Sequence, residues 1–188
     1  DIGNNCAIGN AYPTFEEGRK YLAPGLFGPC GYGFPAVIGA KIGCPETPVV
    51  GFAGDGAFGI SMNEMSSIGR DEWPAITMVI FRNYQWGAEK RNTILWYDDN
   101  FVGTELDPHL SYAKVAEGCG LIGVTVKTQE ELTEALKTAC KAQDDGITTF
   151  IEVILNQELG EPFRRDAMKA PVAVAGIDPN DMRPQQSA

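Results

Sequence analysis

The sequence is poor in the residues that build zinc sites and disulfide-stapled folds. It has 188 residues with one histidine, His109, and its five cysteines are widely spaced with no CxxC pair. Structural zinc sites draw on close pairs of cysteine and histidine, and disulfide frameworks draw on an even number of cysteines. We therefore expect neither, and we interpret the cysteines as buried, reduced thiols of a cytoplasmic protein.

Positive charge and long apolar runs are also scarce. Lysine and arginine number 15 against 25 aspartates and glutamates, which gives a formal net charge of −10. No apolar run reaches the roughly 18 residues of a membrane span. An acidic protein repels nucleic acids and anionic membranes, so neither is expected as a partner. Binding of a small anionic ligand is not excluded, provided that a local group of donors or a metal holds it.

The beginning of the sequence is unusual. It opens with DIGNNC and has neither an initiator methionine nor the pattern of a signal peptide. We therefore expect the chain to be a processed or excised piece.

Short apolar runs alternate with amphipathic stretches along the chain. Continuous apolar runs rich in β-branched residues are typical of parallel strands buried on both faces, and they occur at 48–53, 75–81 and 149–155. Weaker strand candidates lie at 1–3 and 122–126. Helices are expected at 34–43, 59–69, 110–120 and 129–143, the last with a capping box from Thr128 and Glu131. The alternation predicts an α/β fold, with a doubly wound, mostly parallel sheet and helices on both faces.

Two segments interrupt this rhythm. Residues 83–109 show no clear periodicity, and a loop of that length is usually functional. Residues 156–188 are rich in proline and charge, and we expect an extended C-terminal tail there. The domain organisation predicted is an α/β domain over 1–155, incomplete at its N-terminus, followed by that tail.

A glycine-rich turn follows the first strong strand. In GFAGDGAFG, residues 51–59, the glycines Gly54, Gly56 and Gly59 match the dinucleotide-binding fingerprint. Asp55 would repel a pyrophosphate placed on that turn. A Mg²⁺ ion between Asp55 and a diphosphate converts the repulsion into attraction, because the ion is then the largest local charge.

A second ligand for such an ion follows the next predicted strand. Asn83 can offer an amide oxygen, and a backbone carbonyl just after it can offer a third oxygen. Carboxyl ends of parallel strands meet at one edge of the sheet, so these groups are expected to lie together. Arg82, at the end of the same strand, would suit a 2′-phosphate, so an NADP site stays open as an alternative.

The two halves of this pattern resemble a known motif. GDGAFGISMNEM…VIFRNYQWG resembles the cofactor-binding motif of thiamine-diphosphate-dependent enzymes, which begins with GDG and ends in an asparagine pair. Here residues 57–81 separate Gly56 from Arg82 and Asn83, with Arg82 in place of the first asparagine. The resemblance implies a Mg²⁺ ion held by Asp55, Asn83 and the main-chain oxygen of Gln85. It also implies that the cofactor's diphosphate is bound by Gly54, Asp55, Gly56, Ala57, Gly87 and Ala88.

A further segment resembles the same family. FGPCGYGFPAVIGAK, residues 27–41, is similar to the segment that cradles the aminopyrimidine of thiamine diphosphate. The resemblance implies that the Gly28 carbonyl meets the 4′-amino group and that the Cys30 N–H meets a ring nitrogen. The Cys30 side chain would then lie under the bent cofactor. DIGNN is similar to a segment that contacts the diphosphate, which implies roles for Asn4 and Asn5.

Within the family, segments over nearly the whole chain most resemble the sulfoacetaldehyde acetyltransferase branch. The resemblance implies conversion of sulfoacetaldehyde and phosphate to acetyl phosphate and sulfite, with Gly28, Cys30 and Trp86 near the reaction. The glutamate that activates the cofactor in this family lies in a pyrimidine-binding domain that nothing in this chain matches. That domain must then come from the same polypeptide or from a separate subunit, in a homo-oligomer that is at least a dimer.

Two anionic reactants in an acidic protein require local cations. The candidates for sulfonate or phosphate are Arg82, Lys90, Arg91, Arg164 and Arg165. Two other functions stay open beside the acetyltransferase and the NADP enzyme. One is a related thiamine enzyme, such as a sulfopyruvate decarboxylase subunit or an acetohydroxyacid synthase relative, and the other is a non-catalytic cofactor-binding module.

Overall fold

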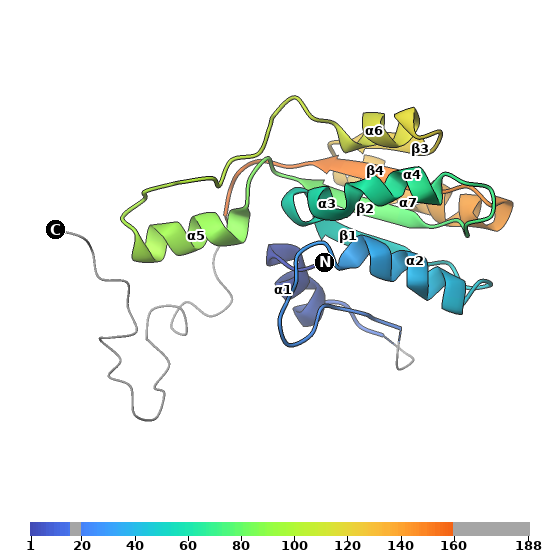
Figure 1. Cartoon of the computed structure of the whole chain (residues 1–188), viewed down its shortest axis with the longest axis horizontal. Coiled ribbons are helices and arrows are strands. Elements are labelled where there is room, and N and C mark those ends of the chain that lie inside the picture. Colours follow the sequence, from blue (N-terminus) through green and yellow to red (C-terminus); the bar gives the residue numbers. More distant parts are fainter. Residues whose placement is uncertain (16–19, 160–188) are drawn as a thin grey trace.

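Four parallel strands form the central sheet of the computed structural model, which describes residues 1–15 and 20–159 (Figure 1). Along the sheet the order is β1-β2-β4-β3, and all three neighbouring pairs are parallel. The strands are β1 (Val50–Gly54), β2 (Thr77–Arg82), β3 (Ile122–Val126) and β4 (Thr149–Ile154). The prediction of a parallel α/β sheet is therefore confirmed.

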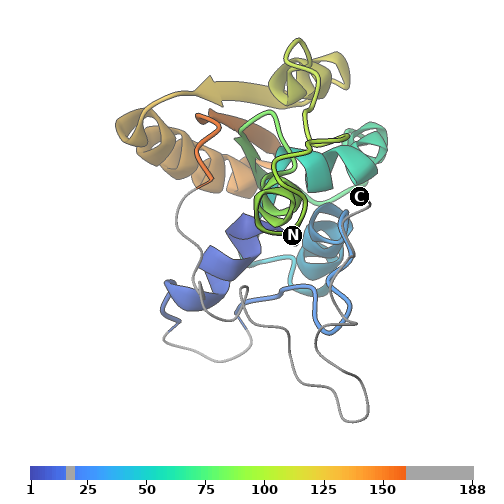
Figure 2. The ribbon, with the colours of Figure 1, turned by 90° about the vertical axis from the view of Figure 1, so that its left-hand side faces the viewer.

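Helices cover both faces of this sheet (Figures 1 and 2). One face carries α2 (Gly33–Gly43), α3 (Asp55–Ser61), α4 (Met65–Ile68) and α6 (Tyr112–Gly118). The other face carries α1 (Asn4–Ala11) and α7 (Gln129–Ala142). Single 3-10 turns, η1 (Met62–Glu64) and η2 (Gln143–Asp145), follow α3 and α7. The molecule thus has the three layers of a doubly wound fold.

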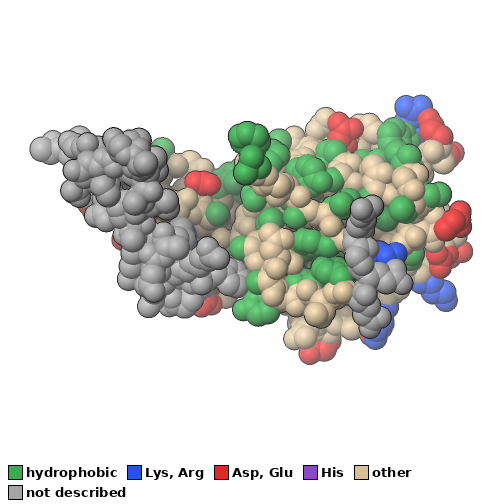
Figure 3. Space-filling view, turned by 90° about the horizontal axis from the view of Figure 1, so that it is seen from below, with side chains coloured by type: hydrophobic (Ala, Val, Ile, Leu, Met, Phe, Trp, Pro, Cys, Tyr) green, Lys and Arg blue, Asp and Glu red, His purple; other side chains and the backbone are tan. Residues whose placement is uncertain are grey.

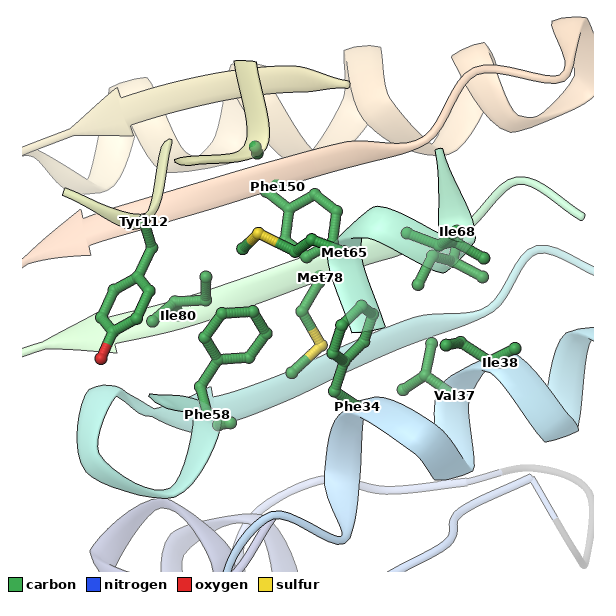
Figure 4. Packing of buried hydrophobic residues seen from close by; sticks show 13 residues of the cluster. Phe34, Val37, Ile38, Phe58, Met65, Ile68, Met78, Ile80, Tyr112 and Phe150 are labelled. Atoms are coloured by element: carbon green, nitrogen blue, oxygen red, sulfur yellow. The ribbon is translucent and has the colours of Figure 1, made fainter. Parts of the chain in front are cut away.

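Successive side chains of β2 point to opposite faces of the sheet and so contribute to two separate parts of the core. Met78 and Ile80 point toward α2, α3 and α6, where aromatic rings such as Phe34 and Phe58 pack at a centroid distance of 5.3 Å (Figure 4). Val79, between them, points to the opposite layer and packs with residues of α7. Successive side chains of a strand face opposite sides, so a strand with helices on both faces must be apolar throughout. That requirement explains why the run at 75–81 shows no polar alternation.

Strand and helix positions agree with the sequence in most places. β3 covers the expected 122–126, and the other three strands overlap their expected ranges within two residues at each end. The capping box at α7 is confirmed: the Thr128 hydroxyl accepts from the Glu131 N–H at 3.2 Å, and the Glu131 carboxylate accepts from the Thr128 N–H at 3.2 Å.

The expected strand at residues 1–3 is wrong. These residues lead into α1, a helix that the sequence did not predict, with Gly3 as its N-cap at φ 118°. The Asp1 carboxylate accepts from the N–H groups of Ile2 and Gly33 at 2.7 and 2.8 Å, which ties this segment to the start of α2. A side-chain tether of this kind leaves no periodic signal in the sequence, so the expectation of a strand had no means of detecting it.

The two segments around the glycine turn also differ from expectation. The helix expected at 59–69 begins at Asp55 and is split into α3, η1 and α4. The stretch 83–109 contains α5 (Gly87–Trp96) and an isolated antiparallel bridge between Gln85 and Glu105. α5 lies away from the sheet, beyond the ends of the strands (Figures 1 and 2). A helix that does not cover the sheet needs no apolar stripe, so its sequence shows no helical period.

Candidate functional site

The carboxyl ends of β1 and β2 carry the predicted metal ligands. Gly54 is paired with Phe81 in the register of the two strands, so Asp55 and Asn83 emerge from neighbouring strands at the same edge. Asp55 begins α3, and Asn83 begins the turn that leads to α5. The parallel fold therefore brings together residues that lie 28 positions apart, the difference between 83 and 55.

The Asp55 carboxylate is buried and held from one side. Its Oδ2 accepts from Arg82 Nη1 at 2.9 Å and from the Tyr84 N–H at 2.7 Å. Its Oδ1 accepts from the adjacent Gly56 N–H at 3.0 Å and lies 3.2 Å from the Asn83 side-chain amide. Burial raises the pKa of Asp55, and the hydrogen bonds from Tyr84 and Arg82 partly offset this effect. Oδ1 is thus the oxygen of Asp55 that is left to meet a ligand.

Three oxygen-bearing groups converge on that side. One atom of the Asn83 side-chain amide lies 2.9 Å from the Gln85 carbonyl oxygen and 3.2 Å from Asp55 Oδ1. If that atom is nitrogen, it donates a hydrogen bond to both acceptors. If it is oxygen, the three oxygens face one another, an arrangement that only a cation stabilises. Carboxylate, amide and carbonyl oxygens are the ligands that Mg²⁺ takes in proteins, so these residues fit the ion.

The chemistry of this group also argues against a zinc centre. Among the described residues, no cluster of three histidine, cysteine, aspartate or glutamate side chains could hold a metal. Zinc favours sulfur and nitrogen ligands, which this oxygen cluster lacks. The cluster is therefore suited to a hard cation that keeps some ligands from water or phosphate.

A cavity of about 820 Å³ opens beside the oxygen cluster. Every residue that the sequence analysis named for the cofactor or for its surroundings lines this cavity, and these are Asn4, Asn5, Gly28, Cys30, Gly54, Asp55, Gly56, Ala57, Asn83, Gln85, Trp86, Gly87 and Ala88. The remainder of the wall is mostly apolar and includes Phe52, Phe81 and Leu136. The fold therefore gathers four distant segments of the sequence around one space.

Trp86 forms one wall of this cavity by lying against the start of α3. A β-carbon added to Gly56 would come within 2.8 Å of the Trp86 indole. Any side chain at position 56 would push the indole away, so the second glycine of the GDG sequence is required by this contact. The glycine pattern thus has a packing reason in addition to any contact with a ligand.

Cys30 lines the cavity with a free, exposed thiol. Desolvation raises the pKa of this thiol, and the charge of Glu89 adds to the increase. A raised pKa keeps the group as a thiol at neutral pH, which disfavours a nucleophilic role. This position is consistent with a supporting contact to a ligand rather than with covalent chemistry.

The predicted cations occupy different environments. Arg82 is 1% exposed and pairs with Asp55, and it does not line the cavity, so a contact with substrate is no longer expected of it. Lys90 pairs with Glu105 and donates to Gln85 Oε1 at 3.1 Å. Arg91, on α5, donates to the Leu159 carbonyl. Arg164 and Arg165 lie outside the described residues.

Glu152, which is 2% exposed on β4, is a buried residue of this site that was not predicted from the sequence. Its carboxylate accepts from Ser111 Oγ at 2.7 Å and from the Tyr112 N–H at 3.1 Å, and it lies 3.7 Å from Arg82 Nε. A charged residue inside a run that is otherwise apolar was the available signal. Buried acids are almost always paired, so the run itself implied a cation or a helix end nearby.

Comparison with known proteins agrees with this geometry. Residues 1–153 match the family described as thiamine pyrophosphate enzyme, C-terminal TPP binding domain; thiamine pyrophosphate is thiamine diphosphate. A probable sulfoacetaldehyde acetyltransferase of Rhizobium meliloti is 81% identical over 99% of the chain and 32% of its own length. The sulfoacetaldehyde acetyltransferase of Roseovarius nubinhibens is 76% identical over 99% of the chain and 31% of its own length. The resemblance to this branch of the family is thereby confirmed.

A solved structure supports the fold independently. The thiamine diphosphate-dependent 4-hydroxybenzoylformate decarboxylase of Rhodococcus jostii RHA1 superposes with a TM-score of 0.62 and 29% identity, over 69% of this chain and 24% of its own. The chain spans about a third of the length of the acetyltransferases that it matches. The family match decides between the two interpretations of the glycine turn in favour of thiamine pyrophosphate. The chain therefore belongs to the thiamine pyrophosphate enzymes and carries their C-terminal TPP-binding domain.

Proposed function

We propose that this chain is the diphosphate- and Mg²⁺-binding part of a sulfoacetaldehyde acetyltransferase. The enzyme would convert sulfoacetaldehyde and phosphate to acetyl phosphate and sulfite. The observation that carries the cofactor side of the proposal is the convergence of Asp55, Asn83 and Gln85 oxygens at the cavity. The substrate is proposed from the acetyltransferases that are 76–81% identical to nearly the whole chain.

Metal and diphosphate would share one end of the cavity. Asp55 Oδ1, the Asn83 amide oxygen and the Gln85 carbonyl would hold Mg²⁺, with diphosphate oxygens and water as its other ligands. The N-terminus of α5, at Gly87 and Ala88, lies beside this cluster, and its first-turn N–H groups, which have no partner within the helix, would bind the diphosphate. Gly54, Gly56 and Ala57 would offer backbone contacts from the other side.

The remaining predicted residues would position the other end of the cofactor. Gly28 and Cys30 would meet the aminopyrimidine with backbone groups, and Asn4 and Asn5, which also line the cavity, would contact the diphosphate. Trp86 would wall the substrate side of the cavity. When bound, the thiazolium ring supplies the nucleophilic carbon, which the protein itself lacks.

The proposed enzyme needs further parts. Relatives three times as long leave room for the pyrimidine-binding domain, which would supply the activating glutamate from the same polypeptide or from another subunit of an oligomer. Leu26 and Phe27 are 94% and 93% exposed beside Gly28, which suits contact with such a part. On the face seen in Figure 3, hydrophobic side chains spread across the middle and charges gather near one rim.

A cytoplasmic location is proposed as well. All five cysteines lie within the described residues and are free thiols, but only Cys6 is buried, so the expectation of buried thiols is wrong for the other four. Reduced cysteines are typical of proteins kept in a reducing compartment. No helix among the described residues is long and apolar enough to cross a membrane.

The assay that tests the proposal uses the complete enzyme. We expect sulfite release from sulfoacetaldehyde to require phosphate, Mg²⁺ and thiamine diphosphate together, with acetyl phosphate formed in equal amount. Omission of phosphate should reduce acetyl phosphate formation to background. Turnover of a 2-oxo acid without any need for phosphate would support the related decarboxylase or synthase instead. A protein that binds the cofactor without any turnover would be the non-catalytic module.

A second prediction concerns the phosphate. Arg91 lies on α5, the helix that follows the turn carrying Asn83 and Gln85. Its guanidinium donates a hydrogen bond to the carbonyl of Leu159, a residue that lines the cavity. If this side chain helps to bind phosphate, Arg91→Ala should raise the KM for phosphate about tenfold, with a smaller change in the KM for sulfoacetaldehyde. Arg70→Ala, which removes an exposed arginine that pairs with Glu72, is the matched control. An unchanged phosphate KM would leave Arg164, outside the described residues, as the next candidate.

A further inference from the structure

We propose that Arg82 is the positioning residue of the Mg²⁺ site, which it shapes without touching the ion or the substrate. Arg82 occupies the position of the first asparagine of the family motif. From the sequence it was predicted to bind the sulfonate or the phosphate. This inference rests on the proposed function to the extent that the oxygen cluster must bind Mg²⁺. Arg82 would set the geometry of both arms of that cluster. The two arms are the Asp55 carboxylate and the turn that carries Asn83 and Gln85.

The first arm is Asp55. Arg82 Nη1 donates to Asp55 Oδ2 at 2.9 Å, and both side chains are 1% exposed. With Oδ2 engaged by Arg82 and by the Tyr84 N–H, the carboxylate has one orientation, in which Oδ1 points toward the Asn83 amide. A carboxylate held in this way meets a metal with one oxygen and loses little freedom when it does so.

The second arm is the turn that carries Asn83 and Gln85. Tyr84, between them, has φ 63°, a left-handed conformation that a bulky residue rarely adopts. The Arg82 guanidinium carbon lies 4.3 Å from the centre of the Tyr84 ring, a cation–π contact between a buried guanidinium and a half-buried ring. Arg82 thus holds the residue whose unusual backbone turns the Gln85 carbonyl and the Asn83 amide toward Asp55.

Arg82 is itself held on the side away from the metal ligands. Its Nη2 donates to the Leu110 carbonyl at 3.0 Å and to the Asp107 carbonyl, both in the segment that precedes α6. Its Nε lies 3.7 Å from Glu152 Oε1, and its guanidinium carbon lies 5.3 Å from the ring of Tyr112. The planar guanidinium therefore connects the two metal arms on one side with β4 and the segment before α6 on the other.

Only arginine can make these contacts together. Its planar fork presents donors in several fixed directions, whereas a lysine ammonium is a single compact charge. Replacement by lysine keeps the charge between Asp55 and Glu152, so the electrostatic attraction for Mg²⁺ changes little. What Arg82→Lys removes is the simultaneous hold on Asp55, on Tyr84 and on the Leu110 carbonyl.

The decisive experiment measures the Mg²⁺ requirement for thiamine diphosphate binding in the complete enzyme, without substrate. Cofactor binding is followed by calorimetry at graded Mg²⁺, and Mn²⁺ binding by electron paramagnetic resonance gives a second readout. We expect Arg82→Lys to raise the Mg²⁺ concentration for half-saturation about tenfold. At saturating Mg²⁺ its cofactor affinity should return to within about threefold of the wild type, because the diphosphate contacts remain.

Ser111→Ala is the matched control. It removes the hydroxyl that donates to Glu152 at 2.7 Å and that caps α6, so it loosens the same buried network from the far side without changing charge. We expect a lower Tm in both variants, but a shift in the Mg²⁺ requirement only in Arg82→Lys. Equal shifts in the two variants, or none in Arg82→Lys, would reduce Arg82 to an ordinary buried ion pair and overturn the proposal.

A second variant keeps the test decisive if Arg82→Lys does not fold. Tyr84→Leu removes the aromatic ring under the guanidinium and leaves the ion pair with Asp55 in place. It should shift the Mg²⁺ requirement in the same direction by about threefold, and an unchanged requirement would overturn the proposal. Failure of the proposed function looks different, because a wild type that binds Mg²⁺ and cofactor but releases no sulfite refutes the acetyltransferase and leaves the assignment of Arg82 standing.

Discussion

Asp55→Asn should lower the affinity for thiamine diphosphate in the presence of Mg²⁺ by about 100-fold or more, which corresponds to roughly 3 kcal/mol. The substitution preserves shape and removes the only carboxylate of the three-oxygen cluster. Mg²⁺ is dehydrated reluctantly and relies on one or two carboxylates in proteins, so a neutral amide is a poor replacement. Calorimetric titration of the cofactor at fixed Mg²⁺, in the complete enzyme, measures the change.

The same substitution should also cost stability. Asp55 is the closest carboxylate to Arg82, and without it the buried guanidinium retains backbone carbonyls and Glu152 at 3.7 Å. Loss of one partner of a buried pair typically costs about 3–5 kcal/mol, so circular dichroism must show that the variant is folded at the temperature of the titration. Asp71→Asn, an exposed aspartate after α4, is the control and should bind normally. Normal Mg²⁺-dependent binding by a folded Asp55→Asn protein would remove the metal site from this edge of the sheet.

Gly123→Ala should be the most damaging small substitution for the fold, at about 2–3 kcal/mol of unfolding free energy. Gly123 lies on β3, where α6 crosses closely. An added β-carbon would come within 2.1 Å of the Ala113 carbonyl oxygen and 3.0 Å of its Cα. These are backbone atoms, so no side-chain rotation relieves the clash, and α6 must move away from the strand.

The matched control for this effect lies on the other side of the same contact. Gly118 is in α6, and an added β-carbon there meets nothing within 4 Å. Gly118→Ala should be neutral or should stabilise by up to about 1 kcal/mol, because alanine is the better helix former. Denaturant unfolding of both variants gives the comparison. A loss below about 0.5 kcal/mol in Gly123→Ala would show that α6 is not packed against β3 as described.

Features that depend on neighbours in the sequence could be predicted. Buried strands such as 149–155 and the capping box of α7 follow from composition and spacing. Asp55 and Asn83 could be paired because both follow strands and the carboxyl ends of parallel strands meet. The resemblance to a known motif then added the cofactor, and the fold placed those residues around one cavity.

Features that depend on burial could not be predicted. Arg82 was assigned to substrate because arginine suits oxyanions, but its partners Glu152 and Leu110 are distant in sequence and give no local signal. The left-handed conformation of Tyr84 is similarly set by surroundings, since tyrosine has no preference for it. α5 was missed because its side chains do not have to match the sheet.

The pairing of β1 with β2 has a consequence for how the domain opens. Asp55 and Asn83 meet because Gly54 is aligned with Phe81, and a slip of one residue would move one ligand by about 3.3 Å and reverse the side chains of that strand. An ion therefore binds only the conformation in which β1 and β2 are paired in the observed register. Its binding lowers the population of every state in which these strands have separated. Slow hydrogen exchange of the amides of β1 and β2 becomes linked to occupancy of the site, whereas β3, at the far edge of the sheet, can open without disturbing either ligand.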